Sequence, residues 1–594
     1  MEIFNKLKGL FSRLSESDKL IILSVVVGVA SGFAAVILEQ LITFFQHALE
    51  FTDPGILGSI RYLIYPGVGM LLSFLIVKYL VKDNIGHGVT KVLLAVSRNE
   101  SRIKPHNMYS SMLTSSLTIG LGGSVGAEAP IVYTGAAIGS NIARSAKMSY
   151  RSMTTLLGCG AAAAIAGIFK APLAGVLFTL EVLLFNISMT SMMPLLFSTV
   201  SATVVSYLFL GRSRPFQCTL TPFSMTNIPF YIILGVLCGL VSVYFLRTTL
   251  HLEDRLAKVV SPYRRWFFCA VLLGLIIFLF PPLFGEGYDF ISILLNGHDI
   301  DLGGQTPLSF LLRSPWGIVL FFLAVLLLKV FAMTLTNAGG GVGGTFGPTL
   351  FVGAIAGFVV ARAINLILVH TPLGLTVPEQ NFVLVGMAAL MAGVMQAPMT
   401  AIFLIAEISG GYELFLPLIL TSAVSFGITR IFEHYSIYTK RIAQSGDLLT
   451  HDSDQSALAL LKTADLIKDK YPKVMMDDSL GTLAQAISNS PASVVAVLDR
   501  KGRFQGLVNV DVTEVRNLLF DTDRYDSIRV SNVMVKAPAK VAPDEKMDSV
   551  MDKFDRTGAW RLPVIDADGK YLGFISKSRI LLAYRDEIKV LFQD

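Results

Sequence analysis

Long apolar runs recur through most of this chain of 594 residues, and they restrict its fold more than any other feature. Residues 21–38, 63–80, 228–246 and 318–335 form runs of about 18 residues, the length that an α-helix needs to cross a bilayer. Because 53% of the residues are hydrophobic and only 15% are charged, an ordinary soluble enzyme is excluded. No spaced nucleophile, base and acid, no P-loop and no metal-ligand cluster stands out in the apolar part, so we expect neither an enzyme nor a metal site.

The charges outside these runs indicate the topology. Lys6, Lys8, Arg13 and Lys19 precede the first run, and the positive-inside rule places such a segment in the cytoplasm. That run is too long for a signal peptide and lacks a small-residue cleavage site. The net charge of +6 is spread along the chain, so we expect no nucleic-acid partner. The sequence therefore predicts an integral, multi-pass membrane protein, which we place in a prokaryotic plasma membrane.

The composition changes after Gly446, where polar and acidic residues replace the apolar runs. We predict a membrane domain over residues 1–446 and a cytoplasmic α/β domain over residues 447–594. The second domain repeats itself, because residues 497–508 match residues 564–575. Each copy is typical of a strand, an Asp/Gly turn, a strand and a helix, preceded by an amphipathic helix over residues 480–488 or 546–556. We expect two units, at about residues 466–520 and 530–588, each covering an apolar face of the other.

The membrane domain also contains an internal repeat. Residues 122–139 match residues 340–357, and residues 166–172 match residues 392–398. Inverted repeats with Gly- and Pro-broken helices are typical of transporters whose ion-binding site lies at the repeat interface. Broken helices are tolerated at that depth only where they are covered by protein or line a cavity. Close helix packing is the alternative explanation for glycine-rich segments. We expect it for residues 161–167 and 353–357, but it does not explain the matched glycine clusters.

Glu128 is a lone carboxylate within the first of these clusters, and the repeat places Phe346 opposite it. A charge at bilayer depth costs at least about 2.5–3.5 kcal/mol and normally marks an ion path. Glycine-rich backbone followed by a helix start attracts anions. Glu128 would therefore compete with an anion for one site, which predicts a gate.

Four short motifs allow a comparison with known families. In chain order they are Gly86-His87-Gly88-Val89-Thr90, Gly126-Ala127-Glu128-Ala129-Pro130, Gly344-Thr345-Phe346-Gly347-Pro348 and Ser436-Ile437-Tyr438. With these motifs the chain resembles the CLC family of chloride channels and chloride/proton exchangers that carry a C-terminal tandem CBS pair. The resemblance implies an all-α polytopic fold with broken helices, a homodimer with one pore in each subunit, and an α/β CBS pair in the cytoplasm.

The resemblance also implies roles for individual residues. Glu128 corresponds to the gating glutamate, which swings away from the external anion site when it is protonated or displaced. The backbone amides of Thr345 and Phe346 and the hydroxyl of Tyr438 correspond to chloride ligands, and we place Gly126 among the anion-binding residues. Binding by N–H and O–H dipoles, without full positive charges, allows an ion to bind and still leave.

Three positions depart from the family pattern. His87 stands where a chloride-binding serine is usual, so we expect an anion ligand or a pH sensor there; a histidine facing solvent or a carbonyl is the alternative. Ala129 replaces the usual glycine. Val182 follows Glu181, whereas exchangers commonly carry an inner proton-transfer glutamate at the valine position. We interpret Glu181 itself as a structural acid, because Glu407 has the same place in the second repeat.

CBS pairs often bind adenine nucleotides through a Ser/Thr and an Asp three residues later. Here the two copies carry Asn509 with Val512 and Ser576 with Arg579. The loss of both acids argues against ordinary ribose recognition, and an adenine nucleotide remains only an alternative to a structural or regulatory dimerisation role. We expect no other cofactor.

These observations predict chloride transport through a CLC-type pore gated by a glutamate, either channel-like or weakly coupled to protons. The alternative is a chloride/proton antiporter, in which His87 or a water chain replaces the inner acid. A fluoride-selective transporter is less well supported, because the motifs at Phe346 and Tyr438 are of the chloride type. The expected partners are chloride or other small anions, protons, the lipid bilayer and a second copy of the chain.

Overall fold

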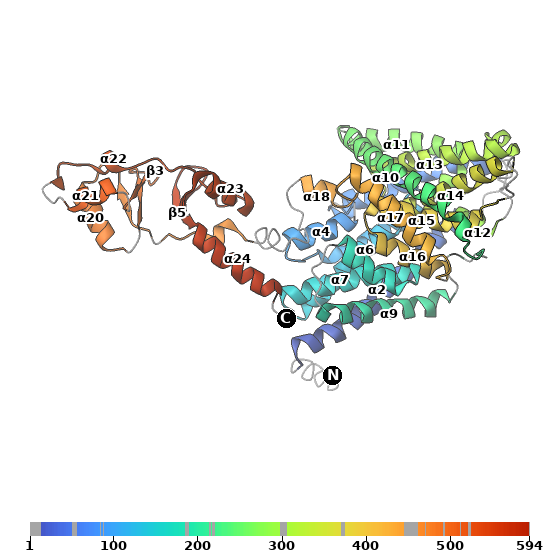
Figure 1. Ribbon diagram of the computed structural model, residues 1–594, viewed down its shortest axis with the longest axis horizontal. Coiled ribbons are helices and arrows are strands. Elements are labelled where there is room, and N and C mark those ends of the chain that lie inside the picture. The colour runs from blue at the N-terminus through green and yellow to red at the C-terminus, as the bar shows by residue number, and fades with distance from the viewer. Residues whose placement is uncertain are drawn as a thin grey trace. The chain divides into compact units, whose positions relative to one another are not determined.

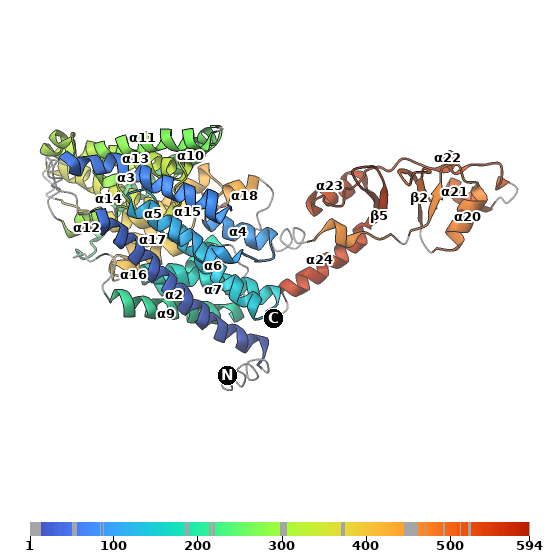
Figure 2. The ribbon, with the colours of Figure 1, turned by 180° about the vertical axis from the view of Figure 1, so that it is seen from behind.

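The computed structural model contains two compact units, formed by residues 1–448 and 449–594 (Figures 1 and 2). The structure describes residues 14–592 apart from 50–55, 84, 87, 184–188, 213–215, 217–219, 260, 298–305, 370–374, 411, 445–460, 470, 491–492, 511–512 and 521–523. The predicted boundary at residue 446 lies in one of these omitted segments and stays a prediction.

The membrane unit consists of two halves whose helices pack in the same pattern. In each half the helix after the glycine cluster packs on its successor (α6 on α7, α14 on α15), and the first helix packs on the last (α2 on α9, α10 on α17). The first half comprises α2 (Glu16–Leu49), α3 (Ile56–Leu75), the π-helical η1 (Ile76–Val81), α4 (Gly88–Arg98), η2 (Pro105–Met108), α5 (Ser110–Gly120), α6 (Glu128–Ser145), α7 (Tyr150–Phe169), α8 (Pro172–Val182) and α9 (Met189–Leu210). The second half comprises η3 (Met225–Asn227), α10 (Ile228–Ala257), α11 (Pro262–Leu279), η4 (Pro281–Leu283), α12 (Tyr288–Asn296), η5 (Ser309–Arg313), α13 (Pro315–Ala338), α14 (Phe346–Leu368), α15 (Glu379–Met395), α16 (Pro398–Ser409) and α17 (Phe415–Phe432), and α18 (Lys440–Gln444) follows. This recurrence confirms the predicted internal duplication.

The helices fit a multi-pass membrane protein. Within the described ranges, nine helices are long and apolar enough to cross a membrane, and shorter apolar helices such as α8 and α16 lie between them. Residues 122–127 and 341–345, which precede α6 and α14, are irregular backbone buried inside the unit. Irregular backbone at membrane depth needs this protein cover, so the structure confirms the predicted broken helices.

Glycines allow α6 to touch α7 and α14 to touch α15 at the backbone. A Cβ on Gly135 would lie 2.1 Å from the Gly160 carbonyl oxygen, and one on Gly353 would lie 2.5 Å from the Gly386 carbonyl oxygen. Such close approach is how small residues hold membrane helices together. The close packing predicted for residues 353–357 is therefore confirmed.

The two halves also cap each other's helices. The Glu181 carboxylate at the end of α8 accepts hydrogen bonds from first-turn amides of α16, at 2.7 and 3.0 Å. In return, the Glu407 carboxylate on α16 accepts from first-turn amides of α8, at 2.9 and 3.2 Å. Acidic groups stabilise helix N-termini because they satisfy free N–H groups and the helix dipole. This reciprocal capping agrees with the structural role predicted for Glu181.

The second unit contains two small sheets with helices beside them. Strands β1 (Lys473–Met475), β2 (Val494–Leu498) and β3 (Phe504–Asn509) form one sheet, and β4 (Arg561–Ile565) and β5 (Tyr571–Ser576) form the other. β1 and β2 are parallel, whereas β2–β3 and β4–β5 are antiparallel. The helices are η6 (Thr463–Leu466), α20 (Leu480–Ser488), α21 (Thr513–Phe520), α22 (Val530–Val533), α23 (Met547–Thr557) and α24 (Lys577–Phe592).

Each copy in this unit has an apolar core of its own, and the two copies share a further apolar cluster. Val497 pairs with Gly506 in the first hairpin, and Val564 pairs with Gly573 at the matching place in the second. The Phe504 ring of β3 stacks on Tyr571 of β5 at a centroid distance of 5.9 Å, within a buried cluster drawn from both hairpins. Each copy thus covers an apolar face of the other, as the repeat predicted.

Candidate anion site

The two glycine clusters meet at the interface between the halves of the membrane unit. The Gly126 amide donates to the Gly344 carbonyl oxygen at 3.0 Å, and the Gly344 amide donates to the Gly126 carbonyl oxygen at 2.7 Å. Nearby, the Ser124 amide donates to the hydroxyl of Thr336 at 3.2 Å, and the corresponding Val342 amide donates to a threonine of α5 at 3.1 Å. These reciprocal bonds bring the N-termini of α6 and α14, the positive ends of two helix dipoles, to one place.

Glu128 is the first residue of α6 and occupies the N-terminus of α14. Its side chain is buried, with 1% of its surface exposed. One carboxylate oxygen accepts from the Gly347 amide at 3.2 Å, and the other accepts from the Tyr288 hydroxyl. A helix N-terminus with free N–H groups attracts anions, and the Glu128 carboxylate fills that place at the start of α14.

Gly126 leaves room for the Glu128 carboxylate because glycine has no side chain. A Cβ at Gly126 would lie 2.1 Å from the nearer Glu128 carboxylate oxygen and 2.8 Å from the Gly347 nitrogen. A side chain there would expel the carboxylate from the helix N-terminus. Since the Gly126 amide already donates to Gly344, it helps to shape the site in this structure, and its predicted role as an anion ligand stays a prediction.

Thr345 and Phe346 lie at the start of α14, where Thr345 contacts Tyr438. The Thr345 hydroxyl donates to the Tyr438 hydroxyl oxygen at 3.3 Å, and Tyr438 lies within electrostatic range of Glu128. The amides of Thr345 and Phe346 belong to the first turn of α14, where helix geometry provides no carbonyl partner. The Phe346 ring stacks on Phe169 at a centroid distance of 5.3 Å, so this residue offers its backbone to the site and its ring to the core.

His87 lies outside the described residues, and its predicted role stays a prediction. The residues that follow it bring α4 to the site. A Cβ on Gly88 would lie 2.3 Å from the Ala129 carbonyl oxygen, and the Thr90 hydroxyl donates to the backbone carbonyl of Tyr438 at 3.3 Å. The first turn of α4 therefore packs against the start of α6 and against the tyrosine.

The sequence interpretation missed three residues at the site: Glu286, Tyr288 and Lys329. Lys329 on α13 is fully buried, and its ammonium donates to the Ser124 hydroxyl oxygen at 2.8 Å and to the Gly285 carbonyl oxygen at 3.0 Å. It interacts electrostatically with the carboxylates of both Glu286 and Glu128. As a lone cation within the apolar run 318–335, Lys329 did carry a sequence signal.

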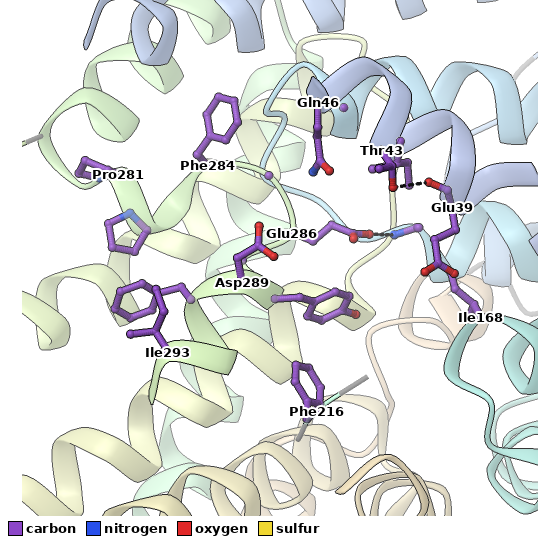
Figure 3. A pocket seen from close by; sticks show the side chains of 18 of the residues that line it. Glu39, Thr43, Gln46, Ile168, Phe216, Pro281, Phe284, Glu286, Asp289 and Ile293 are labelled. Atoms are coloured by element: carbon purple, nitrogen blue, oxygen red, sulfur yellow. Dashed lines mark hydrogen bonds between the residues drawn. The ribbon is translucent and has the colours of Figure 1, made fainter. Parts of the chain in front are cut away.

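A pocket of about 690 Å³ opens beside Glu128. Its wall includes Ala127 and Tyr288, together with Glu286 and with Glu39 of α2, which are labelled in Figure 3. Figure 3 shows the Glu286 side chain reaching across this space to a backbone amide, which belongs to Ala127 and donates to the carboxylate at 2.8 Å. The pocket therefore leads to the residue that directly precedes Glu128.

Tyr438→Phe tests the hydroxyl at this site. The substitution removes one O–H donor, which contributes about 0.5–1.5 kcal/mol, so we expect halide affinity, measured by calorimetry, to fall by up to about tenfold. Phe346→Leu is the control, because Phe346 acts through its backbone and the change should affect access more than binding. Unchanged halide binding in a Tyr438→Ala variant would contradict this site.

Sequence comparisons place this fold and site in a family. The model of the voltage gated chloride channel family matches residues 68–430, and a CBS domain model matches residues 530–586. The chain therefore belongs to the voltage gated chloride channel, or CLC, family and carries a C-terminal CBS domain. The family match covers both glycine clusters and Glu128, whereas Tyr438 lies beyond its end.

Individual relatives agree with this assignment. The chain is 28% identical to the chloride channel protein CLC-e of Arabidopsis thaliana over 68% of its own length and 58% of that protein. It is 25% identical to the H⁺/Cl⁻ exchange transporter ClcA of Salmonella paratyphi B over 75% of its length and 93% of that protein. A solved eukaryotic CLC transporter shares the fold with a TM-score of 0.60 at 17% identity, over 94% of this chain and 97% of the other.

Proposed function

We propose that this protein transports chloride across a membrane through a pore in its membrane unit, with Glu128 as the gate. The observation that carries the proposal is the buried Glu128 carboxylate on the Gly347 amide, at the N-terminus of α14. A carboxylate and a halide compete for such a helix end. Protonation of Glu128, or its displacement by chloride, frees the amides of the first turn and opens the path. The family match points to a channel or transporter rather than an enzyme.

For the mode of transport we propose channel-like or weakly proton-coupled conduction. Val182 supports this mode: it is buried and apolar at the position where exchangers commonly carry an inner acid. Proton-coupled antiport is the second candidate, supported by the resemblance to the ClcA exchanger. In that case His87 or a chain of waters would carry the proton. Fluoride selectivity is less well supported by the motifs around Phe346 and Tyr438.

We also propose that the protein works as a homodimer, as the family resemblance implies, with its N-terminus and its second unit in the cytoplasm. The basic residues before α2 support this orientation.

For the CBS pair we propose a structural or regulatory role without a nucleotide. Ser576 supports this, since its hydroxyl accepts from the Arg579 amide at 3.3 Å and caps α24. In the first copy Asn509 holds the position of Ser576, and Val512, which matches Arg579, lies outside the described residues.

The mode of transport can be tested by measuring the reversal potential in liposomes. We expect it to follow the chloride gradient by about 59 mV per tenfold change, the value for one charge, and to be almost unaffected by a separate proton gradient. A clear shift of the reversal potential with the proton gradient would support the antiporter. A folded protein without anion flux in either gradient would contradict the proposed function.

A further inference from the structure

The loop before α12 presents Glu286 to the start of α6. Gly285 and Gly287 flank this acid, with positive φ angles of 63° and 92°, a conformation that glycine adopts readily. A Cβ on Gly287 would lie 2.4 Å from the Phe351 ring, so no larger residue fits there. The Gly285 amide also donates to the Gly122 carbonyl oxygen at 3.1 Å. The loop is thereby fixed to the first glycine cluster, with Glu286 at its tip.

Glu286 binds at the N-terminal end of α6, as Glu128 binds at that of α14, but through the amide of the N-cap residue rather than an amide of the first turn. Its carboxylate accepts from the Ala127 amide at 2.8 Å, and Ala127 is the residue that caps α6. The pocket is lined by Ala127 and Glu286, but Glu128 lies behind them and is buried. Two acids thus occupy two adjacent anion-attracting helix ends, in series from the pocket inward.

The surrounding charges couple these two acids. Lys329 donates to the backbone carbonyls of Gly285 and Glu286, at 3.0 and 3.3 Å, and interacts electrostatically with both carboxylates. Tyr288 donates to Glu128 from the turn after Glu286. Glu39 of α2 adds a further negative charge facing Glu286. Among the described residues, Arg61, Lys170 and Asp289 are the other charged groups on the pocket wall.

We propose that Glu286 is a second gating acid, placed between the pocket and Glu128. The ionised carboxylate competes with an entering anion for the Ala127 amide, so anion entry from the pocket requires its protonation or displacement. This inference deepens the proposed function and rests on it. It predicts two acid-dependent steps in anion flux, one at Glu286 and one at Glu128.

The test combines substitutions at both acids in the full-length protein. Glu286→Gln keeps an acceptor for the Ala127 amide but cannot ionise, whereas Glu286→Ala leaves the amide free. We expect Glu128→Gln to retain a residual acid activation of chloride flux in liposomes, and the Glu128→Gln/Glu286→Gln double variant to lose it. We expect Glu286→Ala to raise chloride affinity, measured by calorimetry at neutral pH, by about tenfold, the change that corresponds to one charge-assisted hydrogen bond.

Asp289→Asn is the matched control, because it removes the same charge from an exposed position on the same pocket wall; its pH–flux curve should match that of the wild type. Size-exclusion chromatography and thermal unfolding establish that each variant is folded. If Glu286→Ala does not fold, the role of Glu286 is decided by comparing the pH–flux curves of Glu128→Gln and Glu128→Gln/Glu286→Gln. A Glu128→Gln protein whose flux is already independent of pH would overturn the role of Glu286 and leave the Glu128 gate intact. Absence of flux in the folded wild-type protein would instead overturn the proposed function.

Discussion

Glu128→Gln is expected to raise chloride flux at neutral pH by about tenfold or more and to remove the larger part of its acid dependence. The substitution keeps the size of the side chain but removes the charge that binds the Gly347 amide. A hydrogen bond to a charged group contributes about 1.5–3 kcal/mol, and about 1.4 kcal/mol corresponds to a tenfold change in occupancy. Chloride efflux from liposomes, recorded from acidic to neutral pH, measures both effects. Any coupling to protons should disappear in the same variant.

Glu128→Asp is the matched control, because it shortens the side chain but keeps a titratable carboxylate. It should retain a strong dependence on pH, even if its flux differs from that of the wild type. If the Gln variant kept the complete pH dependence of the wild-type protein, Glu128 would not be the gate. The acid dependence would then have to come from another group, for which Glu286 and His87 are the candidates.

The internal repeat shows how much of this fold the sequence alone could predict. The matched glycine clusters predicted that two broken helices meet at the repeat interface, and the structure joins them through the Gly126–Gly344 bonds. The prediction succeeded because glycine marks positions where the backbone comes into close contact, and such positions recur when a fold is duplicated. Glu128 could be selected for a similar reason, since an isolated acid in an apolar environment is costly and seldom occurs without a function.

The partners of Glu128 could not be predicted in the same way. Glu286 reaches Ala127 from 159 residues further along the chain, and Tyr288 reaches Glu128 from 160 residues away. Their local sequence, Gly-Glu-Gly-Tyr, indicates a turn but not what the turn faces. Glu286 and Tyr288 reach Ala127 and Glu128 only because the loop packs on the first glycine cluster. A structural role for Glu181, in contrast, could be predicted because the repeat supplied Glu407 as a second example, although the helix that it caps could not.

Lys329→Met is the other substitution with a large expected effect. Lys329 is fully buried and interacts electrostatically with both Glu128 and Glu286. Methionine preserves much of the length of the side chain but leaves the two acids without their compensating charge. Removing one partner of a buried charge pair costs about 3–5 kcal/mol, so we expect a clear loss of thermal stability in detergent. Lys329→Arg keeps the charge and should lose much less.

The same variant should also change the gate, in a direction that follows from the charges. Without the cation, two neighbouring carboxylates repel each other and take up protons more readily, so the acid activation of chloride flux should begin at a higher pH in Lys329→Met than in the wild type. Introducing Glu286→Gln as well removes one of the two acids and should reverse part of both effects, because residues in one charge network are not additive. Strictly additive losses in the double variant would show that Lys329 stabilises the loop through its hydrogen bonds alone. Partial recovery of stability and of the pH–flux curve would show that Lys329 acts on the gate through its charge.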